Sequence, residues 1–179
     1  VCYLSFKAKQ QAINPITWNT LFWLIILFIA VNAIGKSFTQ ESKQRNIFYY
    51  SIVSPEAVIY SKIFYNALVM IGISFVGILF YSWVMGNHVG NLPLYLLSLL
   101  LGSIGFSATL TMVAGIAAQG ENSATLMSVL SFPIIIPLLL ILLKLSKSAM
   151  DGISMQENWD EMATLAALDV IVIVLSGIL

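Results

Sequence analysis

Long apolar stretches, separated by shorter polar ones, make up most of this sequence. A helix that crosses a bilayer needs about 20 mostly apolar residues. Stretches of about that length or longer lie at residues 16–35, 63–85, 92–118, 125–143 and 162–179. They are too long for strands, and their apolar residues fill all faces without the alternation of a barrel strand. The pattern predicts an all-α, polytopic transmembrane helical bundle that forms a single domain.

Both ends of the sequence are apolar. It opens with Val1 instead of methionine, residues 1–6 are largely apolar, and the last stretch is still apolar at Leu179. The opening run lacks the basic start and the cleavage site of a signal peptide. We therefore expect a truncation at both ends, with residues 1–6 as the end of a further helix and about six spans in the intact protein.

Composition supports the membrane class and excludes others. Hydrophobic residues make up 59% of the chain and charged residues 9%, whereas soluble domains contain about 25% charged residues. Equal numbers of basic and acidic residues leave no basic field for a nucleic acid. The single cysteine, Cys2, excludes an internal disulfide and a cysteine-based metal cluster. Basic residues divide evenly between the two predicted sides, so charge alone gives no orientation.

The connection at residues 36–62 is the most distinctive polar segment. Its charged first part ends at Arg45, and a short aromatic part contains Phe48, Tyr49 and Tyr50. The aromatic part is too short to span a membrane and is suited to lie flat at its surface. Two interpretations stay open: a loop anchored by its aromatic side chains, or a docking element for a soluble partner.

A helix start follows this aromatic part. Ser54 supplies an N-cap, Pro55 suits the first helical position, and Glu56 is an acid in the first turn. We therefore expect a helix that begins near Pro55 and continues into the second apolar stretch.

The third apolar stretch carries small residues four positions apart: Ser103, Ser107, Thr111 and Gly115. Small residues at this spacing let helix backbones approach closely in lipid. A homodimer face or a hydroxyl-lined substrate path would also use such a stripe, but we interpret it as packing within one chain.

Two prolines, Pro133 and Pro137, lie within the fourth apolar stretch. Each lacks a backbone N–H, so the pair is expected to kink the helix. The kink is either plain geometry or a hinge that flexes during transport.

Asp169 lies about two turns into the last apolar stretch. A carboxylate in lipid costs a few kcal/mol, so this side chain should face protein or water, or carry a proton. It is a candidate functional residue by default. A tolerated acid near a helix end, or one that hydrogen-bonds another helix, fits equally well. Asn32 and Asn66 are weaker cases of the same kind.

The sequence contains no clear metal site and no catalytic or nucleotide-binding motif. His88 is the only histidine, and a closed metal site needs several ligands, so we interpret it as a solvated turn residue. The sequence has no Gly-rich phosphate loop with lysine, no Gly-x-Ser-x-Gly elbow and no His-Glu-x-x-His motif. The chain is therefore not expected to be an enzyme, and any ATP chemistry must belong to a partner.

Several segments, in order along the chain, are similar to segments of a known family: 14–19 (NPITWN), 30–41 (AVNAIGKSFTQE), 50–55 (YSIVSP), 105–112 (GFSATLTM) and 130–137 (LSFPIIIP). Together they resemble the CcmB family, the haem-exporter permeases of bacterial cytochrome c maturation. The likeness covers nearly the whole chain and rests on the set of segments, since no single motif among them is diagnostic.

The resemblance implies the permease subunit of an ABC-type exporter of the type-2 class, with several passes through the bacterial inner membrane. The implied partners are a cytoplasmic ATPase of the CcmA type, CcmC, CcmD and the haem chaperone CcmE, besides membrane lipid. No cofactor or metal is expected to bind directly, and haem is one candidate for the cargo. Whether the chain carries haem or relays ATP energy to release the loaded chaperone stays open.

The resemblance also implies an orientation. Residues 36–62 and 119–124 would face the cytoplasm, with the aromatic element as a coupling helix against the ATPase. Residues 7–15, His88 and residues 144–161 would be periplasmic, and His88 receives no haem-ligand role. Two alternatives remain: a permease for another cargo, such as a polysaccharide or drug, and a non-transporting scaffold of the assembly complex.

Overall fold

The computed structural model describes residues 14–39, 55–118 and 123–178, and all regular structure within these ranges is helical. The elements are α2 (Pro15–Thr39), α4 (Pro55–Met85), α5 (Leu92–Ala117), α6 (Ser123–Met150), the short 3-10 helix η1 (Gln156–Asn158) and α7 (Trp159–Ile178). Five of them are long and apolar enough to cross a membrane. The predicted fold class, an all-α transmembrane bundle, is confirmed.

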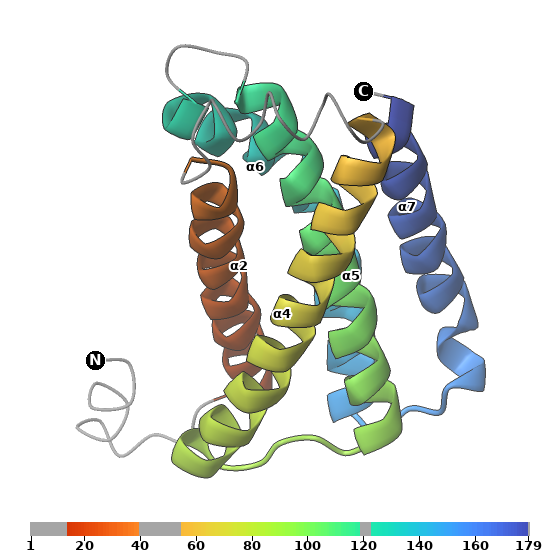
Figure 1. Cartoon of the computed structure of the whole chain (residues 1–179). Helices are drawn as coiled ribbons and strands as arrows, with labels where there is room; N and C mark the ends of the chain where they lie inside the picture. Colours follow the sequence, from red (N-terminus) through yellow and green to blue (C-terminus); the bar gives the residue numbers. More distant parts are fainter. Residues whose placement is uncertain (1–13, 40–54, 119–122, 179) are drawn as a thin grey trace.

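Helix α5 forms the centre of the bundle, and the other long helices pack around it (Figure 1). Around α5 the neighbours follow in the order α2, α4, α7 and α6, and α6 contacts α2 again. Burial differs accordingly, because 67% of the membrane-spanning part of α5 is buried against 17% for α7. A helix that is covered on all sides has no charged face, and α5 contains no charged residue.

The chain runs up and down through the bundle, which gives it two ends, called lower and upper as they stand in Figure 1. The lower end holds the start of α2, the turn between α4 and α5, and the connection between α6 and α7. The upper end holds the end of α2, the start of α4, the end of α5, the start of α6 and the end of α7. Each connection between successive long helices therefore starts and finishes at one end of the bundle.

Asn91 fastens the two connections at the lower end to each other. Its backbone N–H donates to the Ala149 carbonyl at 2.7 Å, and its Nδ2 donates to the Ile153 carbonyl at 2.9 Å. Its Oδ1 accepts the Leu94 N–H at 3.2 Å, which caps α5. This one residue thus caps the central helix with its side chain and holds the end of α6 beside it through its backbone N–H.

Helix α6 is longer than the sequence pattern predicts. The prediction ended the fourth stretch at residue 143 and placed residues 144–161 in a connection, whereas α6 continues to Met150 and α7 begins at Trp159. The physical reason is a buried stripe at helical spacing that continues past residue 143. The stripe consists of Leu138, Leu142, Leu145 and Ala149.

The charges that suggested a connection lie on the outer side of α6. Lys144 and Lys147 are exposed, and Lys144 Nζ pairs with Glu161 Oε1 of α7 at 2.7 Å. Exposed pairs contribute about 0–1 kcal/mol. The ion pair therefore helps to align the two helices, whereas the buried stripe determines the length of α6.

Aromatic side chains on α4 mark the depth of the lipid. Tyr60, near the upper end, is 42% exposed and Trp83, near the lower end, is 82% exposed. The helix between them is about 34 Å long, close to the hydrocarbon thickness of about 30 Å. Because tyrosine and tryptophan favour the membrane–water interfaces, these two residues place the bilayer across the bundle.

Candidate functional site

The stripe of small residues on α5 packs against α4. Its hydroxyl groups form hydrogen bonds between these two helices: Ser103 Oγ to Ser74 Oγ at 3.0 Å, Ser107 Oγ to the Ile63 carbonyl at 2.9 Å, and Thr111 Oγ1 from Asn66 Nδ2 at 3.0 Å. Gly115 is not part of this contact, because a Cβ there would meet no described atom within 4 Å. Packing within one chain, the favoured interpretation, is confirmed for the three hydroxyl residues.

The two asparagines of the membrane helices differ. Asn66 is buried in the contact between α4 and α5, as described above. Asn32 is exposed, and its Nδ2 donates to the Phe28 carbonyl of its own helix at 2.8 Å. Asn66 therefore connects two helices, whereas the hydrogen bond of Asn32 stays within α2.

A polar cluster that the sequence did not reveal joins α2, α5 and α6. Ser146 Oγ accepts hydrogen bonds from Asn19 Nδ2 at 2.8 Å and Trp23 Nε1 at 2.9 Å, and donates to the Leu142 carbonyl at 2.6 Å. Tyr95 OH reaches Asn19 Oδ1 at 3.5 Å. In the sequence, the polar residues Asn19 and Ser146 could have indicated this cluster. Ser146, however, falls in the segment that the apolar pattern assigns to a connection.

His88 lies against buried aromatic side chains at the lower end. Its ring centroid is 5.7 Å from that of Trp18, which also packs on Tyr81 at 4.8 Å and Tyr95 at 6.2 Å. Its Nδ1 is 3.2 Å from the Gly86 carbonyl within the turn. Among the described residues no three His, Cys, Asp or Glu side chains gather as metal ligands. His88 is therefore a partly buried turn residue, less solvated than predicted.

Asp169 is buried in the middle of α7, with 3% of its surface exposed. It faces α5 at Gly105, where a Cβ would lie 2.5 Å from Asp169 Oδ1 and 2.7 Å from Leu138 Cδ1 of α6. Neither carboxyl oxygen has a hydrogen-bond partner in the described part of the chain. The hydrogen bond to another helix that the sequence left open is thus not formed there, and the carboxyl remains a candidate functional group.

The two prolines lie inside α6, and the helix continues through both. Pro133 and Pro137 are exposed on its outer side. A nearby hydroxyl, Ser131 Oγ, donates to the Met127 carbonyl at 2.5 Å within the same helix. A hinge at this place would act through the two missing backbone N–H groups. The continuous helix does not test whether it bends during transport, so the hinge stays a prediction.

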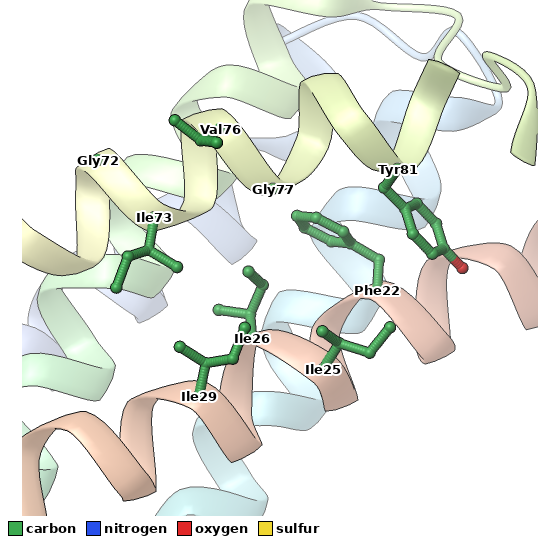
Figure 2. A pocket seen from close by; sticks show the side chains of 9 residues that line it. All are labelled: Phe22, Ile25, Ile26, Ile29, Gly72, Ile73, Val76, Gly77 and Tyr81. Carbon is green, nitrogen blue, oxygen red and sulfur yellow. The ribbon is translucent and has the colours of Figure 1, made fainter. Parts of the chain in front are cut away.

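An apolar groove of about 370 Å³ runs between α2 and α4 (Figure 2). Its lining is Phe22, Ile25, Ile26 and Ile29 from α2, and Gly72, Ile73, Val76, Gly77 and Tyr81 from α4. The polar atom of these side chains, Tyr81 OH, donates to the Trp18 carbonyl at 3.0 Å. The groove lies on the lipid-facing side, where Ile25 and Val76 are exposed, and its lining holds no charged group that would select a charged cargo.

Most of the predicted coupling residues lie outside the described part of the chain: Arg45, Phe48, Tyr49, Tyr50 and Ser54. Pro55 and Glu56 are the first residues of α4, so the predicted helix start is confirmed. Helix α2 ends at Thr39, also at the upper end (Figure 1). The described residues on both sides of the predicted coupling segment therefore lie at the upper end of the bundle.

The comparison with known families is decisive for identity. A family model described as CcmB protein matches residues 4–178. The chain belongs to the CcmB family. A search of curated proteins and a search of solved structures each return no match. Its described residues include five helices that can cross a membrane, so this CcmB-family chain is a multi-pass membrane subunit of the haem exporter of cytochrome c maturation.

In this CcmB-family chain the predicted site residues do not converge on one place. Asp169 is buried in the seam between α7 and α5, and the prolines lie on the outer side of α6. Pro55 begins α4 at the upper end. The described residues thus contain an internal carboxyl, the predicted hinge and the start of the helix that follows the predicted coupling segment, each on a different helix.

Proposed function

We propose that this chain couples ATP hydrolysis by a cytoplasmic ATPase of the CcmA type to haem export, or to release of the haem-loaded chaperone, at the bacterial inner membrane. The observation that carries the proposal is the family match over residues 4–178. The sequence itself has no phosphate-binding loop with lysine, so the nucleotide chemistry falls to the partner. CcmC, CcmD and the chaperone CcmE would complete the assembly.

Helix α4 is suited to carry motion from the ATPase across the membrane. It has 31 residues and is therefore about 46 Å long, enough to cross the whole bilayer. At its upper end it continues from the coupling segment, and along its length it is bonded to α5 through Ser74, Ile63 and Asn66. A movement of the ATPase that displaces residues 46–56 would thus displace α4 together with the central helix α5. A hinge in α6 at Pro133 and Pro137 would let the outer helices follow.

This orientation assigns a compartment to each end of the bundle. The upper end, where α2 and α5 end and α4 and α6 begin, would face the cytoplasm and the ATPase. The lower end, with the His88 turn and the connection between α6 and α7, would face the periplasm and the chaperone. Both assignments come from the family and not from the charge distribution.

Charge placed in the coupling segment tests the proposal. Phe48→Glu and Tyr49→Glu are each expected to reduce co-purification of the ATPase at least about tenfold, because burying an unpaired carboxylate in an apolar contact costs more than about 1.4 kcal/mol. The matched control is Met155→Glu, which places the same charge on an exposed residue at the opposite end. Quantitative pull-down of the assembled complex from membranes gives the readout.

The same complexes also separate transport coupling from a scaffold role. If the chain couples ATP hydrolysis, the Phe48 and Tyr49 variants lose ATP-dependent loading or release of the haem chaperone along with the ATPase. Normal ATPase recovery in both variants would overturn the coupling proposal. Lost ATPase with normal haem delivery would favour the scaffold alternative instead.

A further inference from the structure

An unpaired carboxyl group lies between helices in the interior of the bundle. Asp169 is 3% exposed, and neither of its oxygens has a hydrogen-bond partner among the described residues. It lies beside Gly105 of α5, and the Leu138 side chain of α6 approaches the same position. Helix α7 buries little else, since its other buried residues are Leu165 and Ser176. The carboxyl therefore occupies the middle of the only buried face that α7 has within this described bundle.

A second unsatisfied oxygen lies in the same region. Thr109 is fully buried on α5, and its Oγ1 has no hydrogen-bond partner in the described part of the chain. It follows Gly105 by four residues and so shares that face of the helix. The interior near Asp169 thus holds two polar groups that make no bond to each other.

Charged and titratable groups toward the lower end are distant from this carboxyl. Lys144 of α6 is paired with Glu161, which precedes Asp169 by about 12 Å along α7. Lys147 lies nearly a turn further toward the lower end of α6, and Glu157 lies in η1. The titratable group of α5, Tyr95, is in the first turn of that helix, at the lower end.

The titratable groups on the other side of Asp169 lie on α4. Tyr60 of α4 contacts α7 at Gly177, where a Cβ would overlap its hydroxyl group. Gly177 follows Asp169 by about 12 Å along the helix. Lys62 and Tyr65 follow Tyr60 on α4 within about two turns, in the direction of the level of Asp169. Neither oxygen of Asp169 forms a hydrogen bond with any of these groups.

An ionised carboxylate in this place would be almost completely removed from solvent, and no described residue donates a hydrogen bond to it. Burial of an isolated charge costs far more than burial of a neutral polar group, and acids within membranes face protein or water for this reason. We propose that Asp169 is a proton-binding site in the interior of the membrane bundle, and that α7 packs against α5 with this carboxyl in its neutral, protonated form.

Proton binding and the position of α7 are then linked. Loss of the proton would leave a charge in the seam between α5 and α7, which only entry of water or a cation could stabilise. Helix α7 is the least buried of the long helices, so separation from α5 is easiest there. Since the packed arrangement binds the proton, its stability is greatest at low pH and falls as the pH rises. This inference does not depend on the cargo or on the ATPase.

Infrared spectroscopy of the whole protein in lipid nanodiscs tests the site. At neutral pH the wild type is expected to show the C=O stretch of a neutral carboxylic acid, and Asp169→Asn is expected to lose that band completely. Asp160→Asn, which removes an exposed acid in the first turn of the same helix, is the matched control and should keep the band. Absence of the band from the wild type, or its persistence in Asp169→Asn, would overturn the proposal. An ionised Asp169 with a bound water or cation would give the first of these results.

A second measurement covers the case in which Asp169→Asn fails to fold. Aspartate labelled with ¹³C at its carboxyl carbon shifts the C=O band of an aspartic acid and leaves that of a glutamic acid in place. The other aspartates of the sequence, Asp151 and Asp160, are exposed, so the shifted neutral band belongs to Asp169. A neutral band that does not shift on labelling would contradict the assignment without the need for any variant.

Discussion

Replacement of Trp23 by alanine is expected to lower the free energy of unfolding by about 3–5 kcal/mol. Trp23 is fully buried where α2 meets α5 and α6, with its ring centroid 5.7 Å from that of Phe22 and 6.0 Å from that of Phe106. Its Nε1 donates to Ser146 Oγ at 2.9 Å. The substitution opens a large cavity and removes a hydrogen bond between helices. Packing and hydrogen bonds drive helix association in lipid, so both losses act directly on the bundle.

A second tryptophan provides the control for this prediction. Trp83 is 82% exposed on α4, so Trp83→Ala removes the same number of atoms from the lipid-facing side and is expected to change the unfolding free energy by less than about 1 kcal/mol. Denaturant unfolding in mixed micelles, followed by circular dichroism, compares the two variants. Equal losses for both would show that Trp23 does not pack in the interior as the structure has it.

Gly102→Leu is expected to be the second strongly destabilising change. A Cβ at this position would lie 2.6 and 2.7 Å from Cη2 and Cζ3 of Trp23, and 3.0 Å from Leu142 Cδ2. The indole ring cannot easily retreat, because it is fully buried and held by Ser146. Overpacking typically costs about 1–3 kcal/mol and occasionally more, and a whole leucine side chain should reach the upper part of that range.

The control for Gly102 is another helical glycine. A Cβ at Gly72 of α4 would meet no described atom within 4 Å, and leucine has a higher helix propensity than glycine by roughly 0.5–1 kcal/mol. Gly72→Leu is therefore expected to leave the stability unchanged or slightly higher in the same unfolding assay. If instead the Gly72 variant lost as much stability as the Gly102 variant, the close contact between α5 and Trp23 would not explain either result.

The fold class followed from the sequence because the physical requirement of the bilayer is simple. Each of the five apolar stretches is long enough to cross a bilayer, and each is a helix in the structure. The end of α6 could not be found in this way. A criterion based on average hydropathy stops at Lys144, although Leu145 and Ala149 continue the buried face on the other side of the same helix.

The candidate site was predictable only where a single residue is unusual by itself. Asp169 stood out because an acid in an apolar stretch is rare, and the structure places it in the interior. The bonds of Ser146 to Asn19 and Trp23 join residues more than a hundred positions apart. Such bonds depend on how the helices pack, which the pattern of apolar residues along one helix does not specify.

The two-sided arrangement of the bundle is tested most directly by labelling from outside intact cells with a membrane-impermeant maleimide. In a background with Cys2→Ser, the variants are Asp151→Cys at the lower end and Ala118→Cys at the upper end, both at exposed positions. Asp151→Cys is expected to react in intact cells, and Ala118→Cys only after the membrane is permeabilised. Reaction of both from the same side, or the reverse pattern, would contradict a membrane subunit whose upper end meets a cytoplasmic ATPase.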